Sequence, residues 1–303
     1  MGTAGIILRQ IAVMFIYMAI GWLLFKKHLV TKEGSSSLAN VLLYAVMPCV
    51  ILNSFSVPSY PGKDRAVLLS ILGAAIVLAL SMLLAHAAFR KDAVADFGAA
   101  FSNAGFMGIP LVAAAFGDEA VIFVAGMMAF LFVLQWTYGQ SLLAGNWNEL
   151  SVRKIVTNPL VIAFALGLAI YFARIPVPGL IKGCLSSMSA LNAPLAMVIL
   201  GTYLAEVSFK EIFTSRRLWL ISLYRGFLIP VLTLFLLLLL FPKDRSMAQM
   251  LLVTASAPVG ANVAVFAKKQ GKDYRYACRL VCLSTLLSVV TMPLVLLLWE
   301  ALA

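Results

Sequence analysis

Long apolar stretches alternate with short polar ones along the whole of this 303-residue chain. A helix needs about 20 apolar residues to cross the ~30 Å hydrocarbon core of a bilayer. The connections are short and rich in turn-forming or charged residues, and the longest polar joint falls near residues 144–154. We predict ten membrane-spanning helices, at residues 6–25, 37–57, 66–89, 94–116, 120–143, 155–173, 183–205, 217–241, 246–267 and 276–299.

The amino-acid composition supports a chain that lies mostly in lipid. Hydrophobic residues make up 63% of the sequence and charged residues 12%, whereas soluble domains are about 45–50% apolar and about 25% charged. The net charge is +11, but the cations occupy short loops rather than one polar face. We therefore expect the lipid bilayer as a partner and no nucleic acid.

The distribution of lysine and arginine over the loops predicts the orientation. With the N-terminus outside, the loops after the first, third, fifth, seventh and ninth helices hold 15 basic residues, and the opposite side holds 7. Cytoplasmic loops of membrane proteins carry the excess of such residues. We predict a multi-pass protein of the cell inner membrane with both termini on the extracytoplasmic side.

An internal repeat is indicated by glycine and proline landmarks. Three pairs share an offset of 146 to 148 positions: Gly21 and Gly167, Pro48 and Pro194, and Pro110 and Pro258. Five helices per copy force the second copy to enter the membrane upside down, which gives an inverted repeat typical of transporters. The predicted fold is therefore an all-α membrane protein with a 5+5 inverted repeat; chance alignment of the landmarks is the alternative.

The fourth helix of each predicted half contains an interior proline flanked by glycine. The first has Gly108 before Pro110, and the second has Gly260 after Pro258. Proline removes a backbone donor and clashes with the preceding turn, so it breaks or kinks a helix. Broken backbone at membrane depth is tolerated where it is buried or lines a wet cavity. We expect a substrate site for an anion at these breaks, where half-helices begin with positive ends; a kink that serves packing alone is the alternative.

Polar side chains within the apolar stretches are the candidate ligand-binding groups. Asn103 precedes Pro110 by seven residues, and Asn262 follows Pro258 by four, so both lie near the expected breaks. An amide can bind a carboxylate or satisfy a freed backbone group equally well. Weaker candidates, for which structural roles compete, are Gln135, Tyr138 and Asn53.

One positive charge lies inside a predicted span. Arg225 is eight residues beyond Arg217, about 12 Å deeper at ~1.5 Å per residue. An intramembrane charge is a candidate functional residue. Two roles stay open for Arg225: it attracts an anion, or it caps carbonyls freed at a nearby break.

Acidic residues and histidines fall near loops or span ends. Because no carboxylate is expected at the bilayer centre, coupling to protons or sodium through a buried carboxylate is not predicted. The two histidines are His28 in a loop and His86 near a helix end, with no carboxylate at depth to pair with either. We therefore predict no enzyme, no metal site and no cofactor.

Two segments resemble a known family. Residues 103–111 and 257–268, together with the segments around Pro48 and Pro194, closely resemble the auxin efflux carrier family, which includes plant PIN carriers and bacterial malonate and malate permeases. The likeness covers nearly the whole chain. This chain lacks the long loop of the plant carriers between helices 5 and 6, and its third helix lacks the acid and lysine of their support site.

The resemblance implies a fold like that of the sodium/bile-acid symporters and NhaA-like carriers. Residues 1–60 and 146–208 would form a scaffold, and residues 61–145 and 209–303 a transport domain, with helices 4 and 9 crossing at Pro110 and Pro258. By the same likeness Asn103 matches the family's ligand-binding asparagine, and a homodimer forms through the scaffold.

These features predict a secondary transporter of a small organic anion. The expected mechanism is an elevator-type alternating access, with the site at the crossing of helices 4 and 9, driven by membrane potential and concentration. The alternatives are a sodium- or proton-coupled organic acid symporter and, further, a channel or a ligand sensor on the same scaffold.

Overall fold

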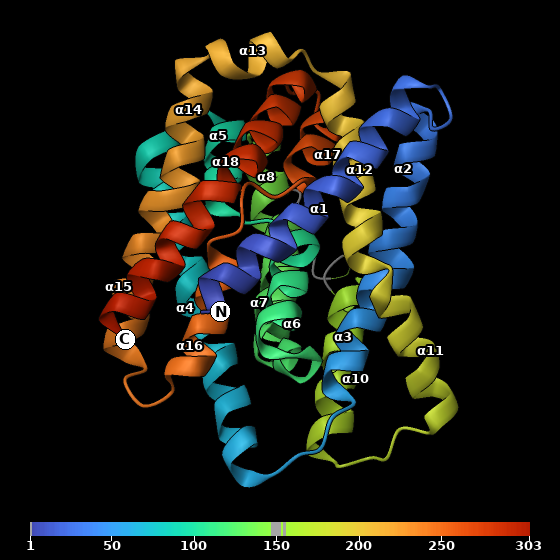
Figure 1. Ribbon diagram of the computed structural model, residues 1–303, viewed down its shortest axis with the longest axis vertical. Helices are drawn as coiled ribbons and strands as arrows, with labels where there is room; N and C mark the ends of the chain where they lie inside the picture. The colour runs from blue at the N-terminus through green and yellow to red at the C-terminus, as the bar shows by residue number, and fades with distance from the viewer. Residues whose placement is uncertain (1, 147–152, 154–155) are drawn as a thin grey trace.

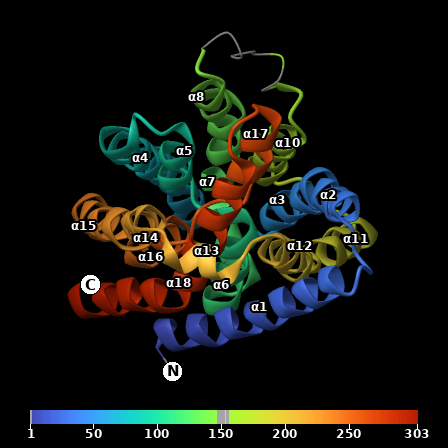
Figure 2. The ribbon, with the colours of Figure 1, turned by 90° about the horizontal axis from the view of Figure 1, so that it is seen from above.

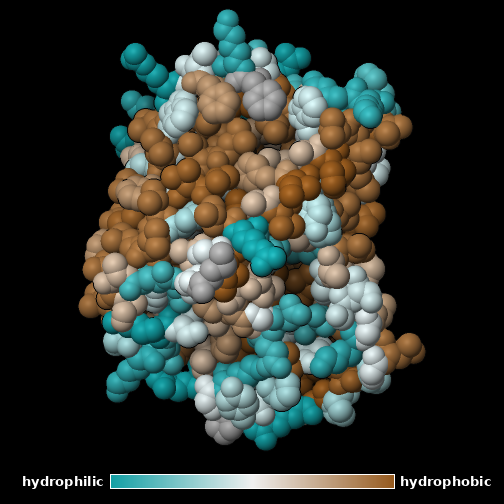
Figure 3. Space-filling view, in the orientation of Figure 1, coloured by the Kyte–Doolittle hydropathy of each residue, from teal (hydrophilic) through white to brown (hydrophobic). Residues whose placement is uncertain are grey.

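The computed structural model describes residues 2–146, 153 and 156–303, and regular structure in these residues is helical. Seven helices in this part of the chain are long and apolar enough to cross a membrane, and two shorter apolar helices span Ala104–Phe116 and Pro159–Phe172. The protein is therefore an all-α, multi-pass membrane protein. Figure 3 shows hydrophobic side chains in a band between hydrophilic groups at the two ends of the molecule.

The first half of the chain contains four unbroken or kinked helices and one that is interrupted. Its elements are α1 (Thr3–Lys26), α2 (Lys32–Val41), η1 (Leu42–Val46), α3 (Met47–Phe55), α4 (Pro61–Phe89), α5 (Ala93–Ala100), η2 (Ala104–Gly108), α6 (Ile109–Phe116), η3 (Asp118–Val121), α7 (Ile122–Leu134), η4 (Gln135–Gly139) and α8 (Gln140–Ala144).

The second half ends in a long C-terminal helix of 29 residues. Its elements are α10 (Pro159–Phe172), α11 (Gly179–Ala190), α12 (Asn192–Glu206), α13 (Phe209–Thr214), α14 (Arg216–Leu223), η5 (Tyr224–Leu228), α15 (Ile229–Leu240), α16 (Arg245–Ala255), α17 (Asn262–Lys269) and α18 (Tyr274–Leu302). The predicted polar joint near 144–154 and the start of the predicted helix 155–173 lie largely outside the described residues.

Side-chain caps fix where several helices begin. The Asp92 carboxylate accepts hydrogen bonds from the backbone of Val94 and Ala95 at the start of α5. Asn158 caps α10 in the same way, immediately before Pro159 at its first position. Such caps satisfy backbone N–H groups that have no partner within the helix.

Three prolines inside the spans follow a wider, π-helical turn. The π-helical turns η1, η2 and η5 each end two residues before a proline, at Pro48, Pro110 and Pro230. A proline cannot donate to the preceding turn and crowds its carbonyl, and a turn with one extra residue relieves both problems. These spans therefore kink without losing their helical path.

Two groups of helices lie on either side of two central helices (Figures 1 and 2). Seen from above, α1, α2, α3, α11 and α12 lie together on one side, and α4, α5, α14, α15 and α16 on the other, with α7 and α17 between them. Helices α1 and α12 approach closely because glycine faces the partner backbone on both. A Cβ atom added to Gly21 would lie 2.0 Å from the Val198 carbonyl oxygen, and one added to Gly201 would lie 2.0 Å from that of Met18.

Candidate functional site

Two helices are interrupted in the middle of the molecule, and their interruptions meet. The first runs from α5 through residues 101–103 to η2 and α6, and the second from α16 through residues 256–261 to α17. Ser102 and Val259 form an antiparallel bridge, in which the Asn103 amide donates to the Pro258 carbonyl at 2.7 Å and the Gly260 amide to Phe101 at 3.0 Å. Each extended segment thus satisfies backbone groups of the other, as membrane depth requires.

The position of the first break differs from the prediction. Pro110 was expected at the crossing, but it lies in the first turn of α6, seven residues past Asn103. The π turn η2 accommodates this proline, so the helix does not need to break there. Pro258 does lie in the second break, where its carbonyl accepts from Asn103.

Gly260 is needed at the crossing for space. A Cβ atom at this position would lie 3.1 Å from the Ser102 carbonyl oxygen and 3.2 Å from that of Phe101. Gly108 has a similar role between η2 and α16, because a Cβ atom added there would lie 3.1 Å from the Thr254 Cα atom. Both glycines let backbones approach closely, which is the common use of glycine between membrane helices.

Arg225 joins the carboxyl ends of the two helices that enter the crossing. Its side chain is 1% exposed. Its guanidinium donates to four acceptors: the Ser81 hydroxyl at 2.9 Å and the carbonyls of Ala99 at 3.2 Å, Ala257 at 3.3 Å and Ala255. The last carbonyls of a helix lack intrahelical partners and carry its negative end. Of the two roles left open for Arg225, this geometry supports the carbonyl cap; direct contact with a ligand stays a prediction.

The amide side of the crossing contains donors without partners. Asn103, Gln135 and Asn262 are 4%, 1% and 8% exposed. Asn262 Nδ2 donates to Gln135 Oε1 at 2.7 Å, which directs the other end of the Gln135 amide toward Gly260. Asn103 Nδ2 and Gln135 Nε2 have no hydrogen-bond partner. Two buried NH₂ groups that lack acceptors suit a ligand that brings carboxylate oxygens.

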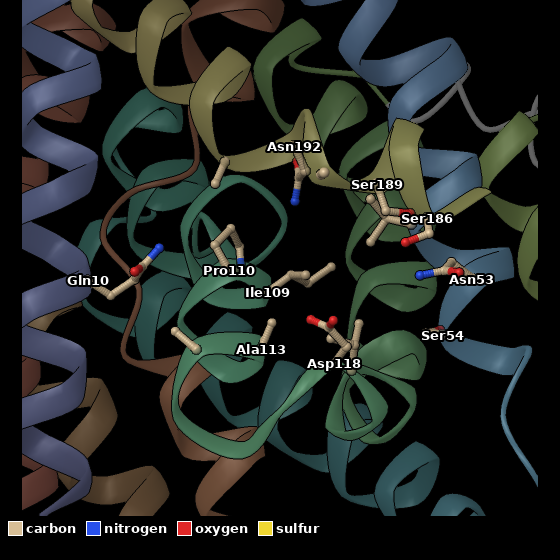
Figure 4. A pocket seen from close by; sticks show the side chains of 15 residues that line it. Gln10, Asn53, Ser54, Ile109, Pro110, Ala113, Asp118, Ser186, Ser189 and Asn192 are labelled. Carbon is tan, nitrogen blue, oxygen red and sulfur yellow. The ribbon is translucent and has the colours of Figure 1, made fainter. Parts of the chain in front are cut away.

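A cavity of about 350 Å³ lies beside α6, the half-helix that follows the first break. Figure 4 shows Asn192 and Asp118 directed into one space, with Ile109 and Pro110 of α6 between Gln10 and Asn53. Asn192 Nδ2 also donates to the Gly105 carbonyl at 3.0 Å, which connects the start of α12 to the first turn of η2. Polar side chains from α1, α3, α11, α12 and η3 line the cavity: Gln10, Asn53, Ser54, Asp118, Ser186, Ser189 and Asn192.

Besides Arg225, Pro258 and Gly108, described above, the predicted site residues occupy three places. Asn103, Gln135, Asn262 and Gly260 gather at the crossing, whereas Pro110 and Asn53 line the cavity. Tyr138 lies 6.3 Å from the Phe101 ring and lines an apolar groove. The sequence interpretation missed Gln10 and Asn192, although an amide within each apolar stretch was a usable signal.

No carboxylate was expected at the bilayer centre, but one near the start of a helix is fully buried. Asp96 on α5 is 0% exposed, and its Oδ2 atom lies 2.8 Å from Nδ1 of His86 on α4. Asp96 lies only three residues into α5, but helices from both halves of the chain cover this short helix. Burial here comes from neighbouring helices rather than from depth in the membrane.

A buried crossing of two broken helices in a multi-pass protein defines a membrane transport protein as the class. A family model described as "Membrane transport protein" matches residues 6–149 and 145–296. The chain belongs to this family, the auxin efflux carrier family, so the resemblance seen in the sequence is confirmed. The protein is a transporter and not an enzyme.

Two relatives extend the comparison. A protein of Rhizobium meliloti (strain 1021) named "Putative malonate transporter" is 26% identical over 226 residues, which cover 72% of this chain and 70% of the relative. A protein of Methanothermobacter thermautotrophicus named "Uncharacterized transporter" is 25% identical over 285 residues, which cover 91% and 92%.

Proposed function

We propose that this protein is a secondary transporter that carries a small organic anion by alternating access, with the ligand bound at the crossing. The observation that carries the proposal is the pair of buried amide donors without partners, Asn103 Nδ2 and Gln135 Nε2. Asn103 directly precedes the half-helix that begins at Ala104, and Gln135 accepts from Asn262, the first residue of α17. The positive ends of these half-helices favour the same negative charge. The name of the R. meliloti relative adds malonate, a small dicarboxylate, as the first ligand to try.

The proposed fold has ten spans in a 5+5 inverted repeat, in which the two broken helices are the fourth and ninth. The scaffold comprises residues 1–60 and 146–208, and the transport domain residues 61–145 and 209–303. The lining of the cavity supports this division, since α1, α3, α11 and α12 belong to the proposed scaffold and α6 and η3 to the proposed transport domain. In an elevator movement the transport domain would carry the crossing past the polar side chains of Gln10, Asn53 and Asn192.

The proposed driving forces are membrane potential and substrate concentration. A monoanion that leaves a cell at 100 mV negative inside gains ~2.3 kcal/mol. Asp96 is a buried carboxylate near the start of a span, so the absence of carboxylates from the spans does not support this proposal. The net charge of an anion supports it, and sodium and proton coupling need separate experimental arms.

The test is uptake of labelled malonate by proteoliposomes. An imposed potential should drive uptake, choline in place of sodium should leave it unchanged, a pH step at clamped potential should not drive it, and preloaded malonate should produce saturable counterflow. Flux that disappears in choline, or that follows the pH step, would replace the uncoupled carrier by a sodium or proton symporter. Flux without saturation or counterflow would indicate a channel. Binding of malonate without any flux would instead indicate a sensor.

The orientation and assembly have their own tests. Cysteines introduced near Thr3 and Ala303 should be labelled from outside intact cells, and one near Gly271 should not, because of the loop charges. Labelling at Gly271 from outside would reverse the proposed topology. Crosslinking through the scaffold in native membranes should yield a homodimer.

A further inference from the structure

The pair of Asp96 and His86 is a buried titratable group that the proposed transport cycle does not use. Asp96 Oδ2 and His86 Nδ1 are 2.8 Å apart, and Asp96 Oδ1 has no hydrogen-bond partner. The Asp96 side chain is 0% exposed, whereas that of His86 is 55% exposed. The pair thus combines a carboxylate sealed from solvent with an imidazole that can exchange a proton.

The pair has two charge states that differ by one proton. With His86 neutral, Asp96 is a buried negative charge whose one partner is a neutral ring. A proton on His86 converts the pair into an ion pair with no net charge. Buried charges are strongly disfavoured unless they are paired, and a protonated His86 supplies Asp96 with an opposite charge at 2.8 Å.

His86 has a route for that proton. It lies three residues before the end of α4 at Phe89, and Arg90 and Lys91 follow directly. Three residues of helix correspond to about 4.5 Å, so the ring lies close to the polar end of the span. Histidine is also the side chain whose charge changes in the physiological pH range.

The other titratable groups around α5 are already engaged. Asp92, the nearest like charge, is held by Arg217 at 2.6 Å and by the Tyr276 hydroxyl at 3.0 Å. Arg225 is directed at the carbonyls of the crossing, and Tyr138 lines the same groove as His86. Lys268 and Lys269 of α17 lie over the rings of Tyr274 and Trp136. His86 is therefore the group that compensates Asp96.

Helix α5 connects this pair to the anion site. Asp96 precedes Asn103 by seven residues, four steps of helix and three of extended chain, which is about 16 Å along the chain. At ~16 Å and an effective dielectric constant of about 20, two unit charges of like sign weaken each other's binding by roughly fivefold. A dianion such as malonate would be affected more strongly.

We infer that the Asp96–His86 pair is a proton-binding site linked to anion binding at the crossing, an inference that rests on the proposed function. An anion at the crossing favours the protonated, uncharged pair, and by reciprocity the proton strengthens anion binding. Malonate binding therefore takes up a proton. Its affinity falls as pH rises and His86 loses its proton, since the bare Asp96 carboxylate then repels the ligand.

The test is calorimetry of malonate binding to the purified protein from about pH 6.5 to about pH 9, where histidine loses its charge. Affinity of the wild type should fall at least tenfold over this range, and the heat in buffers of different ionisation enthalpy should report proton uptake. Asp96→Asn should abolish both effects and keep the tighter affinity at high pH. His86→Gln, which keeps a hydrogen-bond donor, should abolish proton uptake. His28→Gln changes the other histidine and should behave as the wild type.

Two results would overturn the inference. Equal affinity for malonate across the range, without proton uptake, removes the proton site and leaves the transporter proposal standing. If the wild type binds no malonate, which contradicts the proposed ligand, NMR titration of His86 in the His28→Gln variant still decides. The His86 titration midpoint should then change when Asp96→Asn is added, and an unchanged midpoint rejects the linkage.

Discussion

The two sides of the crossing have opposite hydrogen-bonding character. On the carbonyl side, Arg225 and Ser81 satisfy the ends of α5 and α16. On the amide side, Asn103 and Gln135 keep donors without acceptors. A native fold satisfies nearly all of its buried polar groups, so the satisfied side indicates structure and the open side indicates a ligand. The difference also explains why a buried arginine near the proposed anion site need not be a ligand of the anion.

The largest expected effect is the loss of the carbonyl cap. Arg225→Met should lower the free energy of unfolding by at least about 3 kcal/mol, because several buried acceptors lose their donor. Thermal unfolding in detergent, followed by size-exclusion chromatography, measures this. Arg225→Lys retains the charge but not the fork of donors, so it should recover only part of the stability. A stable Arg225→Met protein that has lost malonate binding would instead assign Arg225 to the ligand.

An intermediate effect is expected on the amide side, and on binding rather than folding. Asn103→Ala and Gln135→Ala should each weaken malonate binding by about 1.5–3 kcal/mol, the contribution of a hydrogen bond to a charged group. Asn262→Ala should have a smaller effect on binding, because Asn262 orients Gln135. Calorimetry gives the affinities, with Asn40→Ala on the exposed face of α2 as the matched control. Unchanged affinity with reduced folded yield would make both sides of the crossing structural.

Gly260→Ala probes the contact between the two sides. Its new Cβ atom would lie 3.1 Å from the Ser102 carbonyl oxygen, which is tighter than ordinary van der Waals contact. Overpacking of this kind costs about 1–3 kcal/mol of stability. The unfolding temperature should fall, and Gly108→Ala should act similarly against Thr254. Wild-type stability of both variants would show that the crossing can widen freely.

The smallest effect is expected for Ser81→Ala. The Ser81 hydroxyl donates to the Ala100 carbonyl at 2.7 Å and accepts from Arg225 at 2.9 Å. Its loss should lower stability by about 0.5–1.5 kcal/mol and leave malonate affinity unchanged. A change in affinity measured by calorimetry would mean that the carbonyl side also contacts the ligand.

The sequence predicted the helical class, the family and one of the two breaks. Pro258 correctly predicted its break, because no helix continues through it. Pro110 did not, because the π turn before it lets the helix continue without the backbone hydrogen bond that a proline cannot donate. The pairing of Asp96 with His86 could not be read from the chain, because side chains from separate helices determine it. The cavity could not be predicted either, because Gln10 and Asn192, which both line it, are 182 positions apart in the sequence.

The hydrogen bond from Asn192 to the Gly105 carbonyl would set a rate. Under the proposed elevator movement it joins the stationary part to the moving part, so it must break in every cycle. A bond of about 1 kcal/mol that is lost in the transition state slows a step about fivefold. Asn192 would thus slow turnover. A variant without this side chain would transport its substrate faster and bind it with unchanged affinity.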